Sequence, residues 1–291
     1  MPSIQLIVTG ELEKAFPKAL ERFFPTLDFL PPKWSQGFTS VKIDEQIKIK
    51  TEHMRDVDKL ANALVTTAEM RKAADMIIVV DDLEIINLSH PEKVVECFRE
   101  AVEKQMQAHK ITQKVQKKLQ NDCSFHLLVP MIEAYFFGDK MYHGNPAALN
   151  KAGAILKSTV SGNNLDVEDF KVIEHIHQGV DYLTATGTSN WAKTLENRDK
   201  HPKKYLDYLC CPETDKKTTR KHRYKETKGG VKALKILDWN TVLSSKQNYV
   251  KFLRALTHDI AWKFDLPIDD TGQCASFTEY TDKPNKVLRN I

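Results

Sequence analysis

The sequence is poor in cysteine, with five in 291 residues, an odd number that includes no C-x-x-C pair. A disulfide framework or a cysteine zinc site needs paired or closely spaced cysteines, so both classes are excluded. Long apolar runs are also lacking, because no stretch approaches the ~20 residues that span a bilayer and the N-terminus has no charged leader region. We therefore expect a cytoplasmic protein with reduced thiols and no membrane association.

Two further absences narrow the function. The chain contains no G-x-x-x-x-G-K-[ST] motif, so it is not expected to be a P-loop ATPase itself, and it shows no internal repeat. No strong excess of one charge is present either, since 43 basic residues oppose 39 acidic ones and leave a formal net charge of +4. That total permits a phosphate-bearing partner without demanding one.

The first half of the chain alternates strand and helix patterns. Buried strands are predicted at 4–8, 76–80 and 125–129, and an alternating strand at 40–50, while helices are predicted at 11–24, 53–74 and, with a break, 92–119. Such alternation predicts an α/β domain with a mostly parallel sheet flanked by helices over residues 1–140. Residues 141–291 are predicted to form a mainly helical extension, with helices near 146–158, 166–186, 201–210 and 246–264 and a basic loop at 211–230.

Acidic residues follow the buried strand "MIIVV". Asp81, Asp82 and Glu84 come directly after it, and ligands of open α/β sheets bind beyond the carboxyl ends of the strands. Carboxylates crowded there repel one another unless a cation neutralises them, and Mg²⁺ or Mn²⁺ is the cation that prefers carboxylate oxygen. The alternative is that one aspartate caps a turn and its neighbours are solvated.

Two other acidic positions follow candidate strands. Glu11 and Glu13 come after the first strand, where they are either acids of a helix start that complement its dipole or metal ligands. We favour Glu13 as a ligand and Glu11 as the helix-start acid. Glu133 interrupts the apolar run "FHLLVPMIEAYFFGD" and is either a helix-surface residue or a further ligand, since a buried carboxylate needs a partner.

A basic run lies between residues 216 and 228, with His222 and Tyr224 interleaved. Such a cluster is either a solvated loop or a nucleic-acid contact in which Tyr224 stacks on a base, with Lys200, Lys203 and Lys204 nearby. His175 and His177 are placed in a predicted helix, where i,i+2 residues point apart and share no metal. The candidate nucleic-acid contacts of the run are Lys216, Lys217, Arg220, Lys221, Arg223, Lys225 and Lys228.

Together the motifs resemble a known family. "LIVTGELEKAF" followed by "MIIVVDDLE" is similar to the Toprim pattern, in which an acidic loop beside a glycine and a later D-x-D-type loop jointly hold divalent metal. "PMIEAYFFGD", "HPKKYLDYL" and "YKETKGGVKAL" further resemble small Toprim-like proteins of unknown function from bacterial defence loci, distant relatives of the overcoming-lysogenization-defect nucleases. The family normally has a glutamate before the glycine, whereas this chain has Thr9.

The resemblance implies a Toprim-like, Rossmann-like fold and a metal-dependent nuclease that hydrolyses DNA or RNA in anti-phage defence. The catalytic residues would be Glu13, Asp81, Asp82 and Glu84, and the Mg²⁺ or Mn²⁺ ligands would include these with Glu11 and Glu133. Because the replaced glutamate often serves as the general acid or base, Thr9 supports an alternative. In that alternative the chain is a catalytically degenerate interaction subunit of a defence complex with an ATPase encoded nearby, and an oligomer is compatible with either function.

Overall fold

The computed structural model describes residues 1–43, 52–153, 156–160, 166–211, 224–244, 250–267 and 286–291. These residues divide into two compact units, one formed by Met1–Leu128 with Lys251–Ile291 and the other by Val129–Val250. The sequence predicts a boundary after residue 140, with all later residues in one helical extension. In the structure the segment Lys251–Ile291 instead belongs to the first unit, because helix α10 (Lys251–Lys263) packs on its sheet.

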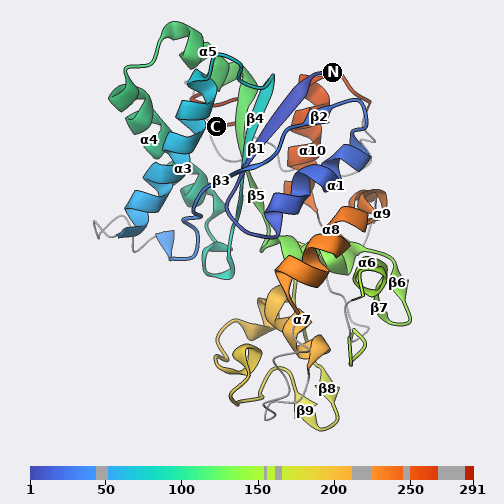
Figure 1. Ribbon diagram of the computed structural model, residues 1–291. Coiled ribbons are helices and arrows are strands. Elements are labelled where there is room, and N and C mark those ends of the chain that lie inside the picture. The colour runs from blue at the N-terminus through green and yellow to red at the C-terminus, as the bar shows by residue number, and fades with distance from the viewer. Residues whose placement is uncertain (44–51, 154–155, 161–165, 212–223, 245–249, 268–285) are drawn as a thin grey trace. The chain divides into compact units, whose positions relative to one another are not determined.

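The first unit is an α/β domain built on a five-stranded sheet whose pairings are all parallel (Figure 1). The strand order is β2-β1-β4-β5, and β3 also pairs with β1. Nearly all residues of β1, β4 and β5 are buried, as expected of strands covered on both faces. The strands are β1 (Ser3–Val8), β2 (Asp28–Phe29), β3 (Lys33–Trp34), β4 (Met76–Asp82) and β5 (Cys123–Leu128).

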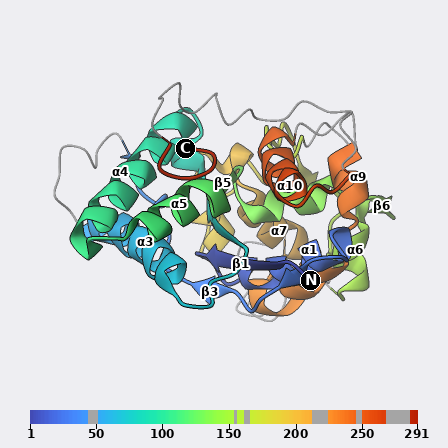
Figure 2. The ribbon, with the colours of Figure 1, turned by 90° about the horizontal axis from the view of Figure 1, so that it is seen from above.

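Helices cover both faces of this sheet. Figures 1 and 2 show α3, α4 and α5 on one side and α1 and α10 on the other. Pro91 opens α4, and Thr112 caps α5 by accepting a hydrogen bond from the backbone N–H of Val115, so the predicted break between them is confirmed. The helical segments are η1 (Glu13–Ala15), α1 (Phe16–Phe23), α3 (Glu52–Glu69), η2 (Ile85–Asn87), α4 (Pro91–His109) and α5 (Gln113–Asp122).

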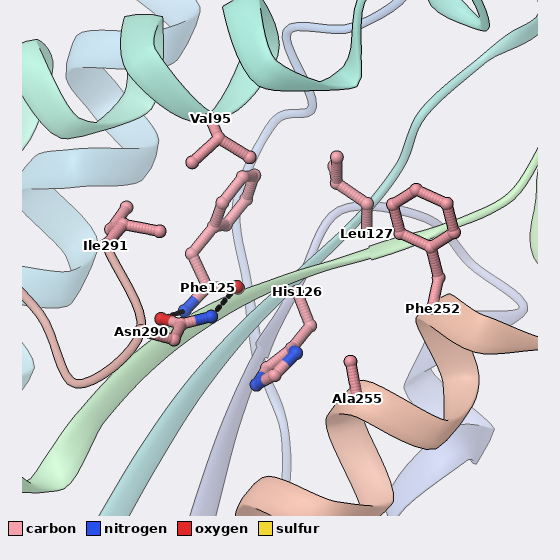
Figure 3. A pocket seen from close by; sticks show the side chains of 8 residues that line it. All are labelled: Val95, Phe125, His126, Leu127, Phe252, Ala255, Asn290 and Ile291. Atoms are coloured by element: carbon pink, nitrogen blue, oxygen red, sulfur yellow. Dashed lines mark hydrogen bonds between the residues drawn. The ribbon is translucent and has the colours of Figure 1, made fainter. Parts of the chain in front are cut away.

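The outer edge of β5 is covered by the chain's own last residues. The side-chain amide of Asn290 both accepts from the Phe125 N–H (3.0 Å) and donates to the Phe125 carbonyl (2.5 Å), as a neighbouring strand would (Figure 3). The Arg289 N–H donates to the Cys123 carbonyl at 2.7 Å. An edge that would otherwise expose unpaired backbone groups is thereby satisfied.

The second unit combines short helices with two hairpins. Its core holds Tyr182, Trp191, Tyr205 and Tyr208 around Arg198, which is buried and donates hydrogen bonds to three backbone carbonyls. The elements are η3 (Ile132–Gly138), β6 (Met141–Tyr142), β7 (Asn145–Pro146), α6 (Ala147–Lys151), β8 (Ile176–His177), β9 (Val180–Asp181), η4 (Asn190–Ala192), η5 (Arg198–Lys200), α7 (Pro202–Cys210), η7 (Glu226–Gly230), α8 (Val231–Ile236) and α9 (Trp239–Ser244).

Several predicted elements differ from the structure. The helix predicted at 166–186 is absent from those residues, which contain the hairpin β8–β9, because Gln178 and Gly179 both adopt positive φ, the geometry of a tight hairpin turn. The helix predicted at 146–158 is shortened to α6, and the chain turns at Gly153 with φ 78°. The strand predicted at 40–50 begins in non-strand residues, and positions 44–50 lie outside the described residues.

Candidate active site

The site is built at the carboxyl end of the parallel sheet. Val8 of β1 is in register with Val80 of β4, so Thr9 and Asp81, the residues that follow, lie beside each other where the two strands end. Parallel strands bring their carboxyl ends to one edge, which is why residues 72 positions apart in sequence meet there. The predicted location of the acidic site therefore agrees with the topology of the sheet.

Asp81 is held by the chain on both of its oxygens. The Thr9 hydroxyl donates to Asp81 Oδ1 at 2.6 Å, and the Phe38 N–H lies 3.5 Å from Oδ2, at the limit of a hydrogen bond. Gly37 allows this approach, because a Cβ at that position would lie 2.9 Å from Asp81 Oδ1. The more weakly bonded oxygen, Oδ2, is therefore the one better placed to take an additional ligand.

The electrostatics of Asp81 are unusual for an aspartate. Its side chain is buried, and this burial, with the negative charges of Glu13 and Glu84, raises the pKa of Asp81 to about 7. The hydrogen bonds from Thr9 and Phe38 lower the pKa but do not offset these effects. Two carboxylates thus act on a third, buried one at this edge of the sheet, in an arrangement that favours positive charge.

Glu13 is buried, with 4% of its surface exposed, in the short helix η1. Its carboxylate lies over Gly10, because a Cβ on Gly10 would collide with the carboxyl atoms of Glu13. Glu84 follows β4 with φ 61°, a left-handed conformation that is costly for a residue with a Cβ and that recurs at functional sites. Glu13 is thus held over Gly10 and Glu84 is held at a positive φ, and both charges act on Asp81.

Other predicted ligands are not brought to this point. Asp82 follows Asp81 within β4, and since the strand pairs with β5 through both residues, their side chains leave opposite faces of the sheet. Glu11 points to solvent and pairs with Lys14 at 2.5 Å. Glu133 belongs to the second unit, where it is buried in η3; burial, with a smaller contribution from the negative charge of Glu133, raises the pKa of Tyr224.

The donor set fits a hydrated divalent ion better than a closed metal cage. Among the residues that the structure describes, no three His, Cys, Asp or Glu side chains converge into a ready metal-binding group. Mg²⁺ is usually bound by one or two carboxylates, with water and substrate phosphate completing its shell. Asp81 and Glu13 supply such a pair in chemical type, and Glu84 adds charge beside them.

The predicted nucleic-acid residues fall largely outside the described part of the chain. This applies to Lys216, Lys217, Arg220, Lys221 and Arg223. Lys225 is exposed directly before η7, and Lys228 lies within it. The expectation that Tyr224 stacks on a base is wrong, because Tyr224 is only 8% exposed and burial raises its pKa.

Residues near the basic run have structural contacts. Lys203 forms an ion pair with Glu226, and Lys204 donates to Thr194 Oγ1 at 2.5 Å. His175 precedes a hairpin strand and contacts Ser158 (2.9 Å) and the Tyr205 hydroxyl (2.6 Å). Burial raises the pKa of Cys210 to about 12, so its thiol is not a ready nucleophile at neutral pH.

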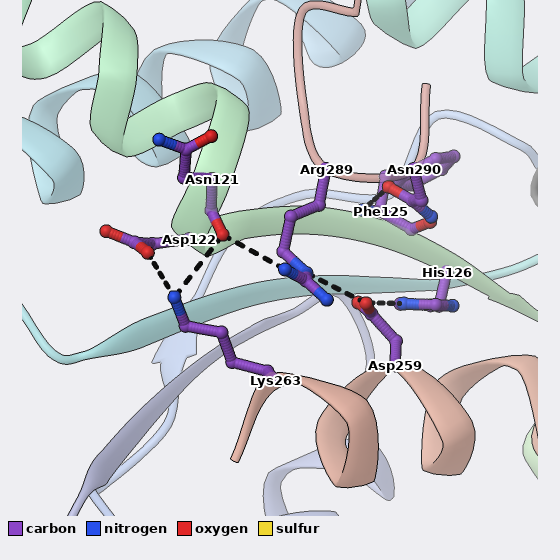
Figure 4. A network of polar contacts seen from close by, with 8 residues as sticks. All are labelled: Asn121, Asp122, Phe125, His126, Asp259, Lys263, Arg289 and Asn290. Atoms are coloured by element: carbon purple, nitrogen blue, oxygen red, sulfur yellow. Dashed lines mark hydrogen bonds and ion pairs between the residues drawn. The ribbon is translucent and has the colours of Figure 1, made fainter. Parts of the chain in front are cut away.

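A second feature of the first unit is a small pocket at the edge of β5 between α4 and α10 (Figure 3). No carboxylate lines it, so it is not the candidate metal site. Beside it, Asp259 of α10 accepts hydrogen bonds from His126 (3.1 Å) and Arg289 (2.8 Å) in a buried network (Figure 4). The pocket residues are Val95, Phe125, His126, Leu127, Phe252, Ala255, Asn290 and Ile291.

Sequence reasoning missed the groups that fix Asp81. The resemblance identifies Thr9 only as the residue that replaces a glutamate, whereas its hydroxyl makes the shorter of the two hydrogen bonds to Asp81, at 2.6 Å. Nothing in the local sequence pattern links Gly37 and Phe38 to the end of β4, although Phe38 contacts Asp81, which lies 43 residues later. The only available signal was Gly37 itself, a glycine in a segment between two strands.

Comparison of the whole chain with protein-family models, curated proteins and solved structures finds no match in any of the three. Among the described residues, no helix combines the length and apolar character needed to cross a membrane. The functional interpretation therefore rests on the carboxylates at the end of β4 and their surroundings.

Proposed function

We propose that this protein is a Toprim-like, metal-dependent phosphodiesterase that hydrolyses nucleic acid. The observation that carries the proposal is the placement of buried Asp81 at the carboxyl end of β4 under the negative charge of Glu13 and Glu84. A buried carboxylate surrounded by like charge is costly unless something positive binds there. Nucleic-acid hydrolysis is a reaction that uses Mg²⁺ or Mn²⁺ on such carboxylates.

In this mechanism Asp81 and Glu13 would hold the metal, with Glu84 beside them. When bound, the ion would polarise the scissile phosphate and lower the pKa of water. The chain's own contribution is positioning, because the Thr9 hydroxyl and the Phe38 N–H hold the Asp81 carboxylate in one orientation. Gly37 has no Cβ, and this allows the backbone before Phe38 to pass close to Asp81 Oδ1, where a Cβ would lie at 2.9 Å.

The test compares two neighbouring carboxylates. Asp81→Asn removes the proposed ligand, whereas Asp82→Asn removes one negative charge from the adjacent residue, whose side chain leaves the other face of the sheet. We expect Mg²⁺ or Mn²⁺ titration calorimetry to show binding in the wild type and in Asp82→Asn but not in Asp81→Asn. Cleavage of labelled DNA and RNA should follow the same order. Equal cleavage by wild type and Asp81→Asn would overturn the proposal.

A specific observation also favours a second function, a non-hydrolytic subunit that docks on an ATPase. Thr9 occupies the position at which the Toprim resemblance expects a glutamate, and it uses its hydroxyl to bind Asp81 rather than to supply a carboxylate. Under this alternative the wild type would bind Mg²⁺ and cleave nothing. Thr9→Glu separates the two, because a gain of cleavage on adding the glutamate would identify a degenerate catalytic site.

A further inference from the structure

The loop that follows β3 lies against the candidate site. The N–H of Phe38 lies 3.5 Å from Asp81 Oδ2, and Gly37 comes close to the other oxygen of the same carboxylate. The ring of Phe38 is fully buried, and its centroid lies 6.3 Å from that of Phe98 and 6.4 Å from that of Phe125. The loop is therefore anchored in the core by this side chain while its backbone faces Asp81.

The backbone that follows Phe38 is held by one buried side chain, that of Asn87. Its Nδ2 donates to the Thr39 carbonyl at 2.6 Å and to the Val41 carbonyl at 3.1 Å, and its Oδ1 accepts from the Ile43 N–H at 3.1 Å. Asn87 is only 2% exposed. Both protons of its NH₂ group are thus used, and the amide fixes alternate residues of the loop at three points.

The chemistry of these contacts requires an amide at position 87. The loop offers two carbonyls and one N–H, and a carboxamide is the side chain that presents two donors and an acceptor in so small a volume. An aspartate would face both carbonyls with an oxygen, and an apolar side chain would leave three backbone groups without their partner. A buried backbone group that loses its partner is costly, so the position of the loop depends on Asn87.

Asn87 is also tied to the acidic end of β4. It is the last residue of η2, and its N–H donates to the Glu84 carbonyl at 3.1 Å. Glu84 is the residue with positive φ whose negative charge acts on Asp81. The same short turn therefore carries Glu84 and, through Asn87, holds the loop that brings the Phe38 N–H to Asp81.

We propose that Asn87 is a positioning residue of the candidate site, which holds the loop 36–43 against Asp81 and thereby fixes the carboxylate in the orientation that binds a divalent ion. This inference rests on the proposed function and adds to it a residue that touches neither the ion nor the substrate. Groups that orient a metal ligand from outside the coordination shell typically contribute about 10- to 100-fold in metal affinity.

The first experiment observes the loop in the absence of metal. The amide proton of Phe38 is followed by NMR in EDTA at pH 8 in the wild type, Asn87→Ala and Asn290→Ala. Asn290 is the matched control, because it is a buried asparagine of the same unit whose amide binds the Phe125 backbone and not the loop. We expect Asn87→Ala to move the Phe38 signal most of the way to its position in Asp81→Asn, and Asn290→Ala to leave it in place.

The second experiment measures Mg²⁺ affinity by calorimetry. We expect Asn87→Ala to weaken binding about tenfold and Asn290→Ala to leave it unchanged. If Asn87 only stabilised the fold, the two variants would lose stability and bind Mg²⁺ alike. An unmoved Phe38 signal in Asn87→Ala, or wild-type affinity in that variant, would overturn the inference.

If Asn87→Ala does not fold, the link is measured with Asn87 intact. The side-chain NH₂ signals of Asn87 should then differ between the wild type and Asp81→Asn, whereas those of Asn290 should not; unmoved Asn87 signals would overturn the inference. If the wild type binds no Mg²⁺ although the Phe38 signal responds to Asn87→Ala, the loop contact stands and the proposed function fails. If the wild type and Asn87→Ala bind Mg²⁺ equally and cleave nucleic acid, the proposed function stands and the role of Asn87 fails.

Discussion

Replacing the buried aspartate by its neutral isostere should stabilise the metal-free protein. The pKa of Asp81 is raised from 3.8 to about 7, so above pH 4 the unfolded chain is ionised at this position while the folded protein still holds a proton. Stability is therefore lost as the pH rises from about 4 to about 7, and the full cost is present above pH 7. At 1.36 kcal/mol per pKa unit, that cost is about 4 kcal/mol.

The expected gain in Asp81→Asn is smaller than this cost. The amide keeps an oxygen that accepts from Thr9, but its NH₂ group faces the Phe38 N–H, and a lost hydrogen bond costs about 1 kcal/mol. We expect Asp81→Asn to be about 2–3 kcal/mol more stable than the wild type at pH 8 and no more stable at pH 3. Urea unfolding in EDTA across this pH range measures both values.

The control is again Asp82→Asn, whose effect should not follow this pH profile. Added Mg²⁺ should stabilise the wild type and leave Asp81→Asn unchanged, because a ligand stabilises only the protein that binds it. The reasoning is refuted if Asp81→Asn gains nothing at pH 8, or if its gain is the same at pH 3 and pH 8. In either case Asp81 would not carry the burial and charge cost that the proposal requires.

Three further predictions concern single contacts. Gly37→Ala places a Cβ 2.9 Å from an oxygen of Asp81 and should weaken Mg²⁺ binding in calorimetry; unchanged affinity would show that the loop gives way. Arg198→Met leaves buried carbonyls without their donor and should destabilise the second unit by about 3 kcal/mol in thermal unfolding. Asn290→Ala uncovers the β5 edge and should speed amide hydrogen exchange at Phe125, whereas unchanged protection would contradict the edge-pairing role of its amide.

The central strands were predictable because their chemistry is local. A strand covered on both faces must be apolar throughout; the runs at 4–8 and 76–80 fall within β1 and β4, and the run at 125–129 overlaps β5 except for Val129, which follows its last residue. The same reasoning placed Asp81 near the residues after β1, since parallel strands end at one edge. Fold class and the location of the candidate site follow from these two rules.

Strand ends, turns and tertiary contacts could not be predicted where a single residue decides the local geometry. The predicted strand ends at residue 80, whereas β4 continues through Asp82 by pairing with β5, and this continued pleat sends the side chains of Asp81 and Asp82 to opposite faces of the sheet. The segment containing Gly179 was predicted as helix because its apolar spacing is compatible with one, but the turn at that glycine permits a hairpin. Contacts such as Phe38 to Asp81 depend on tertiary packing that no local pattern records.

Two buried aspartates in the first unit show what distinguishes a structural acid from a functional one. Burial works to raise the pKa of Asp259, yet the hydrogen bond from His126 and the charges of His126 and Arg289 hold it below its usual value. At Asp81 burial acts in the same direction, but the described groups that act on it are a hydroxyl, a backbone amide and two carboxylates. Among the described residues, Asp259 is thus compensated by cationic partners, whereas Asp81 has hydrogen bonds but no cation beside it, which is the electrostatic condition that favours a divalent cation at the end of β4.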